Sequence, residues 1–194
     1  ASGTMMKPIF AAAKSASRKR VAYAEGEEER VLRACQIVVD EGLARPTLIG
    51  RPAVIAQRIE QFGLRLKEEL DYDIVNVEQD LRYRDFWQTY HRMMERRGVT
   101  TQIAKIEMRR RLTLIGSMLL HKGDVEGLIC GTWGTTAMHL DYVDQVIGKR
   151  TGVHTYACMN GLMLPGRQVF LLDTHVNYDP TAEQLAEITT MAAE

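Results

Sequence analysis

Apolar residues recur at helical spacing in several segments of the chain, and short apolar runs lie between these segments. Pro52 opens one helical pattern, Thr100 and Thr181 are predicted N-caps, and Gly42 is a predicted helix C-cap. The segment 112–120 is apolar with Gly116 inside it, which permits close backbone packing. The spacing predicts helices over 8–17, 27–42, 52–62, 83–96 and 135–147, one after Thr100 and one after Thr181.

The short apolar runs between the helices predict buried strands. They lie at 21–24, 46–50, 72–76 and 128–131. Strands alternating with helices of this length indicate an α/β fold with three αβα layers and a doubly wound, mostly parallel sheet. After Gly152 the pattern changes to closely spaced strands at 153–159, 162–165 and 169–173. We therefore expect a domain boundary near residues 148–152.

Composition and charge exclude several classes of protein. The 194 residues include 25 basic and 25 acidic side chains, a globular composition without the basic surplus typical of nucleic-acid binders. Three cysteines without CxxC spacing predict a reduced, cytoplasmic chain with neither a disulfide framework nor a zinc site. No apolar run is long enough to span a membrane. Neither end has the pattern of a natural terminus, so we expect a piece of a longer polypeptide.

Three loops are expected at the carboxyl ends of strands, where α/β sheets bind ligands. They are 25–27, 131–136 and 173–177. The second combines glycines and threonines before a helix, so its N–H groups and hydroxyls could hold a phosphate, although a packing and capping role is slightly favoured. The candidate ligand-binding residues are Gly131, Thr132, Trp133, Gly134, Thr135, Thr136, Asp173 and Asn177.

Other chemistry-bearing residues leave alternatives open. Asp173 and His175 could form an acid–base pair, but a structural hydrogen bond is favoured. The arginines at 109–111 are either a phosphate cluster or, by preference, a solvated helix face. Cys130 is expected to be a buried, inert thiol, and Trp133 either stacks on a ligand or lines a subunit contact. Neither a catalytic residue nor a metal site is predicted, because the remaining histidines lack ligand spacing.

Several short motifs, in order along the chain, resemble the phosphate acetyl/butyryltransferase family. They are AEGEEERVLRA at 24–34, GLARPTLIG at 42–50, RGVT at 97–100, GLICG at 127–131 and DTHVNYDPTAE at 173–183. Two further stretches resemble the C-terminal domain of bacterial NADP-dependent hybrid malic enzymes, in which a malic-enzyme half precedes such a domain. These stretches are MMKPIFA at 5–11 and YRDFWQTYH at 83–91.

The resemblance implies a two-lobed acyltransferase fold. Residues 1–16 would be a linker helix from the malic-enzyme half, 17–150 the first lobe and 151–194 the beginning of a second lobe. Three positions depart from the transferase pattern: Met94 and Asp141 stand where transacetylases have arginines, and Gly134 replaces a loop histidine. Losing these cations removes attraction for phosphate or coenzyme A.

A retained fold with altered site residues implies a regulatory and oligomerisation module that responds to acetyl-CoA. The alternative is an active phosphate acetyltransferase. The resemblance also implies that the parent protein forms a homo-oligomer and uses NADP and a divalent metal, Mg or Mn, for malate decarboxylation. No cofactor of this chain itself, no nucleic acid and no membrane is expected as a partner.

Overall fold

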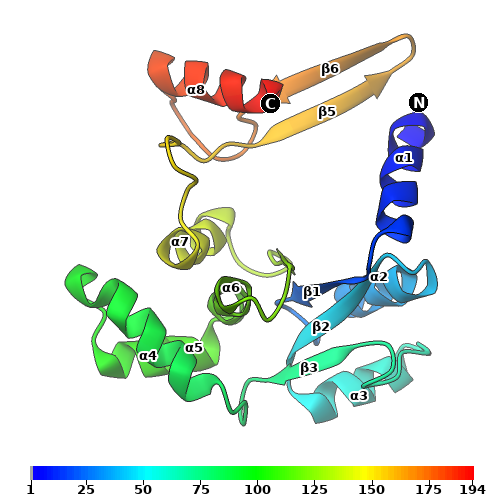
Figure 1. Cartoon of the computed structure of the whole chain (residues 1–194), viewed down its shortest axis with the longest axis vertical. Helices are drawn as coiled ribbons and strands as arrows, with labels where there is room; N and C mark the ends of the chain where they lie inside the picture. The colour runs from blue at the N-terminus through cyan, green and yellow to red at the C-terminus, as the bar shows by residue number, and fades with distance from the viewer. Residues whose placement is uncertain (1) are drawn as a thin grey trace. The chain divides into compact units, whose positions relative to one another are not determined.

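The computed structural model describes residues 2–194, which form two compact units (Figure 1). The larger unit spans residues 11–147, and the smaller unit contains the chain up to residue 10 together with residues 148–194. Helix α1 (Ser2–Ser15) contributes residues to both units, and every other helix and strand lies within one of them. The assignment of segments 1–16, 17–150 and 151–194 to a linker and two lobes stays a prediction.

A four-stranded parallel sheet forms the centre of the larger unit. Its spatial order is β3 (Asp73–Asn76), β2 (Ala44–Gly50), β1 (Lys19–Tyr23) and β4 (Gly127–Ile129). The pairing aligns Tyr23 with Leu48 on one side and with Ile129 on the other. Because all the strands are parallel, their carboxyl ends meet at one edge of the sheet. The predicted doubly wound α/β fold is confirmed.

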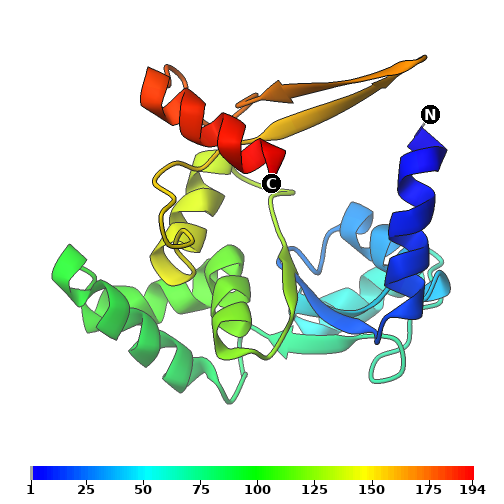
Figure 2. The ribbon, with the colours of Figure 1, turned by 45° about the horizontal axis from the view of Figure 1, so that its top comes forward.

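Helices cover both faces of this sheet (Figure 2). On one face, α2 (Glu29–Asp40) and α3 (Pro52–Gln61) bury a cluster that includes Leu32, Cys35 and Ile55. On the opposite face α6 (Leu112–Lys122) lies against β1, β2 and β4. The helices α4 (Tyr83–Met94), α5 (Thr101–Arg110) and α7 (Thr136–Val146) join it in a second buried cluster. A short 3-10 helix, η1 (Glu95–Arg97), joins α4 to the turn before α5.

Local signals set the first and last residues of these helices largely where the sequence predicts. The Thr100 hydroxyl accepts the Ile103 N–H as an N-cap, and Thr135 does the same for Met138 at the start of α7. After α2, Gly42 has a φ of +66° and donates its N–H to the Val39 carbonyl. Gly42 therefore terminates α2 one residue beyond the formal cap.

Gly116 lets α6 lie directly on the sheet. A Cβ atom at this position would be 2.4 Å from Leu128 Cδ1 and 3.4 Å from Ile49 Cδ1. Side chains from both β4 and β2 thus fill the space that any larger residue would need. The close backbone packing predicted from the sequence is confirmed.

The smaller unit contains an antiparallel hairpin and a helix. The hairpin strands are β5 (Met159–Leu164) and β6 (Arg167–Leu172), and the helix is α8 (Ala182–Ala193). Thr181 and Gln184 form a capping box at the start of α8, as expected of a Thr N-cap.

The predicted strand over 153–159 is wrong, because residues 153–158 are irregular. Side chains bind their backbone groups instead of a neighbouring strand. Glu187 Oε1 accepts the His154 N–H at 3.0 Å, and Asn177 Nδ2 donates to the Tyr156 carbonyl at 2.8 Å. A backbone satisfied in this way has no need of a sheet partner.

The N-terminal helix also differs from the prediction of 8–17. Helix α1 runs from Ser2 to Ser15, so Pro8 lies inside it and not in its first turn. Proline removes one backbone donor, but the good helix formers around it carry the helix through.

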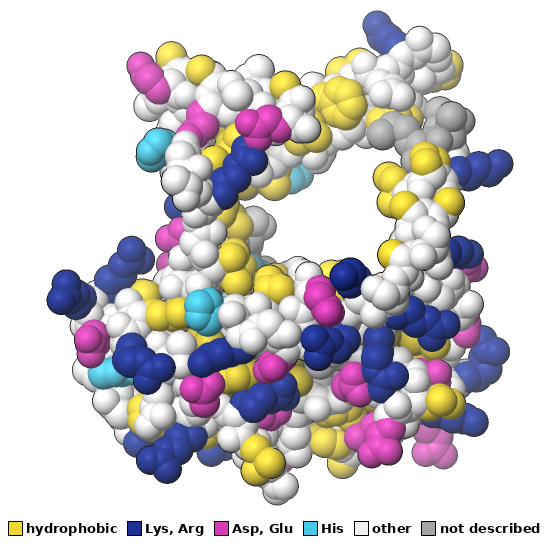
Figure 3. Space-filling model, in the orientation of Figure 1, with side chains coloured by type: hydrophobic (Ala, Val, Ile, Leu, Met, Phe, Trp, Pro, Cys, Tyr) yellow, Lys and Arg dark blue, Asp and Glu magenta, His cyan; other side chains and the backbone are white. Residues whose placement is uncertain are grey.

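Charged side chains of both signs occur together on the visible face of the larger unit, where they are interspersed (Figure 3). Within residues 2–194, every helix is too short or too polar to cross a bilayer.

Candidate functional site

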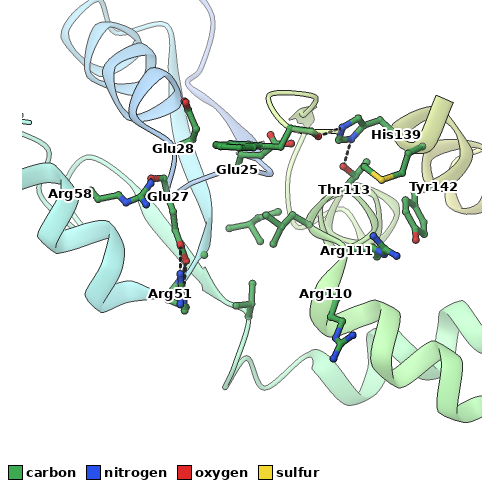
Figure 4. Close-up of a pocket in the computed structure, with 16 residues that line it drawn as sticks. Glu25, Glu27, Glu28, Arg51, Arg58, Arg110, Arg111, Thr113, His139 and Tyr142 are labelled. Atoms are coloured by element: carbon green, nitrogen blue, oxygen red, sulfur yellow. Dashed lines mark hydrogen bonds and ion pairs between the residues drawn. The ribbon is translucent and has the colours of Figure 1, made fainter. Parts of the chain in front are cut away.

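A pocket of about 460 Å³ opens at the carboxyl edge of the parallel sheet, entirely within the larger unit (Figure 4). Glu25 and Glu27 follow β1, Arg51 follows β2, and Trp133 follows β4. The junction between α5 and α6 and one side of α7 complete the walls. This is the position at which open α/β sheets bind ligands.

One wall is held by an ion pair between Glu27 and Arg51. The Arg51 guanidinium contacts both carboxylate oxygens, with Nε 2.9 Å from Oε1 and Nη2 2.7 Å from Oε2. The Arg51 backbone N–H also donates to Oε1 at 2.8 Å, and Arg58 donates to the Glu27 carbonyl. Hydrogen bonding by Arg51 lowers the pKa of Glu27 below its usual value, although partial burial opposes the shift. The network ties the turn after β1 to the start of α3.

Replacing Glu27 with glutamine is expected to lower the free energy of unfolding at neutral pH, because the amide cannot pair with Arg51. The pKa of Glu27 is depressed from 4.5, so its ionised form stabilises the folded state above that pH. This contribution decreases as the pH falls from 4.5 through the lower folded-state pKa. Urea denaturation at pH 7 and at a pH of about 3 should therefore show a stability difference that shrinks on acidification.

Glu60→Gln provides the matched control for this charge change. Glu60 is exposed on α3, the helix that Arg51 precedes, and has no ion pair among residues 2–194. A difference between wild type and Glu27→Gln that stayed constant with pH would contradict a role for the ionised carboxylate.

Glu25 connects the two loops that flank the pocket. Its side chain is buried, and its Oε1 accepts the N–H of Gly131 at 3.1 Å. Gly131 and Gly134 have φ values of +110° and +99°, a region that favours glycine. The turn after β1 and the loop after β4, which the sequence nominated separately, are thus joined.

His139 on α7 holds the other end of the same loop. Its Nε2 lies 2.6 Å from the Trp133 carbonyl, and its Nδ1 lies 2.6 Å from the Thr113 hydroxyl of α6. Because a carbonyl can only accept, Nε2 carries the proton and donates it to Trp133. In the neutral ring, Nδ1 then accepts from Thr113. Both ring nitrogens are therefore engaged within the protein.

The arginines at 109–111 divide between the two sequence-based interpretations. Arg109 packs on the Tyr83 ring and donates to the Glu78 carbonyl, so it belongs to the surface of the α4–α5 pair. Arg110 and Arg111 line the pocket. Arg111 pairs with Glu107 at 3.1 Å, whereas Arg110 has no ion pair within the described chain.

Two further groups near the pocket are held in their neutral forms. Burial raises the pKa of the Cys130 thiol. Burial also raises the pKa of Tyr142, and its hydroxyl donates to Glu107. A thiol and a phenol in this state are poor nucleophiles at neutral pH.

Of the eight predicted ligand-binding residues, Trp133 lines the pocket. Its side chain is 65% exposed. Thr135 caps α7, and Gly131 bonds to Glu25. Their part in binding stays a prediction.

Asp173 and Asn177 belong to the smaller unit and form a local turn. Asp173 Oδ1 accepts from the Asn177 side chain at 3.0 Å and from its backbone N–H at 3.3 Å. His175 is exposed. The favoured structural interpretation of Asp173 agrees with these bonds.

Sequence reasoning missed most of the pocket-lining side chains. Arg51 carries a usable signal, because it follows a predicted strand directly and so belongs to the carboxyl edge. His139 and Tyr142 carry no such signal, because they lie mid-helix on α7 and look like ordinary core residues. Among the described residues, no group of three or more His, Cys, Asp or Glu side chains could hold a metal ion.

Comparisons with known proteins agree with this fold. A family model described as phosphate acetyl/butaryl transferase matches residues 4–194. A phosphotransacetylase from Streptococcus pyogenes superimposes with a TM-score of 0.83 at 22% sequence identity, over 96% of this chain and 56% of that one.

Sequence relatives include two malic enzymes. The chain is 49% identical over 189 residues to an NADP-dependent malic enzyme from Escherichia coli, covering 97% of this chain and 25% of that protein. It is 44% identical over 192 residues to an NAD-dependent malic enzyme from Rhizobium meliloti, covering 99% and 25%. The chain thus spans about a quarter of the length of these relatives.

Proposed function

We propose that this chain, which belongs to the phosphate acetyl/butaryl transferase family, is a regulatory and oligomerisation module of a malic enzyme. In this proposal it does not itself transfer acyl groups, and the intact cytoplasmic polypeptide oxidatively decarboxylates malate to pyruvate with NADP. The nicotinamide cofactor and a divalent metal, Mg or Mn, bind to a preceding malic-enzyme half. Acetyl-CoA binds to the present chain and changes the rate of that half.

The observation that carries the proposal is a formed pocket whose reactive groups are all engaged. His139 uses both ring nitrogens within the protein, and Tyr142 bonds to Glu107. Burial keeps Cys130 protonated. Among the described lining residues, none is an unengaged histidine, cysteine or tyrosine that could act as a base or nucleophile. Such a pocket can bind a ligand without converting it.

The two positions at which transacetylases have arginines support the same conclusion. Met94 is 5% exposed and belongs to the hydrophobic core, so it cannot reach a ligand. Asp141 is exposed on α7 and accepts a hydrogen bond from Gln145 at 2.8 Å. A carboxylate at this position repels phosphate. Charge that would favour a transferred phosphate is therefore missing at both positions.

Four arginines line the pocket, and Arg110 is the one whose side chain binds no other described group. Arg51 and Arg111 are paired with Glu27 and Glu107, and Arg58 donates to the Glu27 carbonyl, while Arg110 has no ion pair among the residues described. The Trp133 indole offers a surface on which a ring of the ligand could stack. These two groups would recognise the phosphates and the adenine of acetyl-CoA.

The test measures malate-dependent NADPH formation by the intact polypeptide with and without acetyl-CoA. We expect acetyl-CoA to change this rate. In Arg110→Glu, the acetyl-CoA concentration that gives half of this change should rise about tenfold, as for loss of a charge-assisted contact. Arg96→Glu makes the same charge change on η1, outside the pocket, and should leave the response intact. If the rate of NADPH formation is the same with and without acetyl-CoA, the proposal is wrong.

The alternative function is an active phosphate acetyltransferase, which the fold alone also allows. It requires acetyl transfer from acetyl-CoA to phosphate, with release of coenzyme A. We expect no such release from the intact polypeptide, as measured with a thiol reagent. Steady coenzyme A formation that depends on phosphate would favour the alternative.

A further inference from the structure

The loop between Gly131 and Gly134 is built from a backbone that would be mobile if unrestrained. Both glycines have positive φ values, and Trp133 between them exposes 65% of its surface. Glycine has the largest backbone freedom of any residue, so such a loop samples many conformations unless other groups hold it.

Two buried side chains hold this loop, one at each end. The Glu25 carboxylate binds the N–H of Gly131 at 3.1 Å, and the His139 imidazole binds the carbonyl of Trp133 at 2.6 Å. His139 is itself anchored on α6 through Thr113 and is 8% exposed. The position of the Trp133 backbone is thereby fixed relative to two helices, α6 and α7.

His139 also occupies the space that a side chain at position 134 would need. A Cβ atom on residue 134 would lie 3.2 Å from His139 Nε2 and 2.5 Å from Met138 Cε. The imidazole, the methionine and the glycine therefore form one fitted arrangement.

We propose that His139 is a positioning residue that latches the 131–134 loop, so that the Trp133 indole is held ready at the pocket before a ligand arrives. His139 acts through the Trp133 carbonyl and need not touch the ligand. Preorganisation of this kind lowers the entropy that binding must otherwise remove. The proposed ligand, acetyl-CoA, rests on the proposed function, whereas the latch itself does not.

Two substitutions of similar volume separate latching from packing. His139→Leu fills the space but cannot donate to the Trp133 carbonyl, whereas His139→Gln retains an amide N–H that can reach it. The first readout is hydrogen–deuterium exchange of the Gly131 N–H, the N–H of this loop that Glu25 binds, in the intact polypeptide. We expect exchange to rise about tenfold in His139→Leu and to stay near wild type in His139→Gln. Exchange over β1 should be unchanged in both variants.

The second readout is acetyl-CoA affinity measured by calorimetry. We expect about tenfold weaker binding in His139→Leu, because the unlatched loop would have to be ordered when the ligand binds. Binding in His139→Gln should stay near wild type. Thr113→Val removes the anchor of the imidazole and should increase loop exchange even if His139→Leu does not fold.

The outcomes distinguish the latch from the proposed function. Unchanged loop exchange in His139→Leu and Thr113→Val, or equal effects of leucine and glutamine, would overturn the latch. If the wild-type polypeptide does not bind acetyl-CoA, the proposed effector is wrong, and loop exchange alone decides whether His139 is a latch.

Discussion

Met94→Arg is expected to destabilise the protein by about 3 kcal/mol or more, because it places a charge in the hydrophobic core. Met94 is 5% exposed and lies in the same cluster as Phe86, Tyr90 and Met108. A buried guanidinium in this cluster would lose its hydration among apolar side chains. The free energy of unfolding from urea denaturation measures the effect.

Two comparisons make the Met94 prediction specific. Met94→Leu keeps volume and polarity and should cost less than about 1.5 kcal/mol. Asp141→Arg also restores an arginine of the transferase pattern, but Asp141 is exposed on α7, so its effect should stay within about 0.5 kcal/mol. If Met94→Arg were as mild as Asp141→Arg, position 94 would be open to solvent, and the argument against a transferase site there would fail.

Gly26→Ala is expected to cost about 3 kcal/mol and to distort the pocket, because the new methyl group would collide with the backbone. A Cβ atom at position 26 would lie 2.8 Å from the carbonyl oxygen of Ile49 and 2.9 Å from its nitrogen. Gly26 also donates its N–H to that carbonyl at 3.1 Å. The turn after β1 can therefore escape the collision only by moving away from β2. Such a movement would displace Glu25 and Glu27 together.

Gly127→Ala is the control for the loss of a strand glycine. Its Cβ atom would meet Val21 at 3.5 Å, an ordinary van der Waals contact, so a change within about 0.5 kcal/mol is expected. In Gly26→Ala, the midpoint of thermal unfolding should fall and hydrogen–deuterium exchange over 131–134 should change. In Gly127→Ala, both quantities should stay at their wild-type values. Wild-type stability of Gly26→Ala would show that the turn and β2 are not in close contact.

Most of the secondary structure of the larger unit was predictable because its signals are local. Ile55 and Ile59 lie one helical turn apart in the sequence, and both are buried on α3. Thr100 accepts a hydrogen bond from a backbone N–H three residues away. Gly42 adopts the positive φ value that ends α2, and this depends on the one residue alone. Neither signal depends on any distant part of the chain.

The strand predicted over 153–159 failed because the decisive partners are remote in sequence. Residues 153–158 have the apolar content of a strand, yet Glu187 and Asn177 bind their backbone. These partners lie 33 and 21 residues away from the groups they bind. Apolar periodicity contains no information about such a partner.

The fold class and the order of helices and strands in the larger unit follow from the sequence alone, because periodicity, caps and glycine turns act within a few residues. The pocket was decided by tertiary structure. Glu25 meets Gly131 across 106 residues, and His139 meets Thr113 across 26. Parallel pairing of β1 with β4 and packing of α7 on α6 bring these groups together. Whether position 94 faces a ligand or the core, and whether His139 is free or bound, depend on that packing.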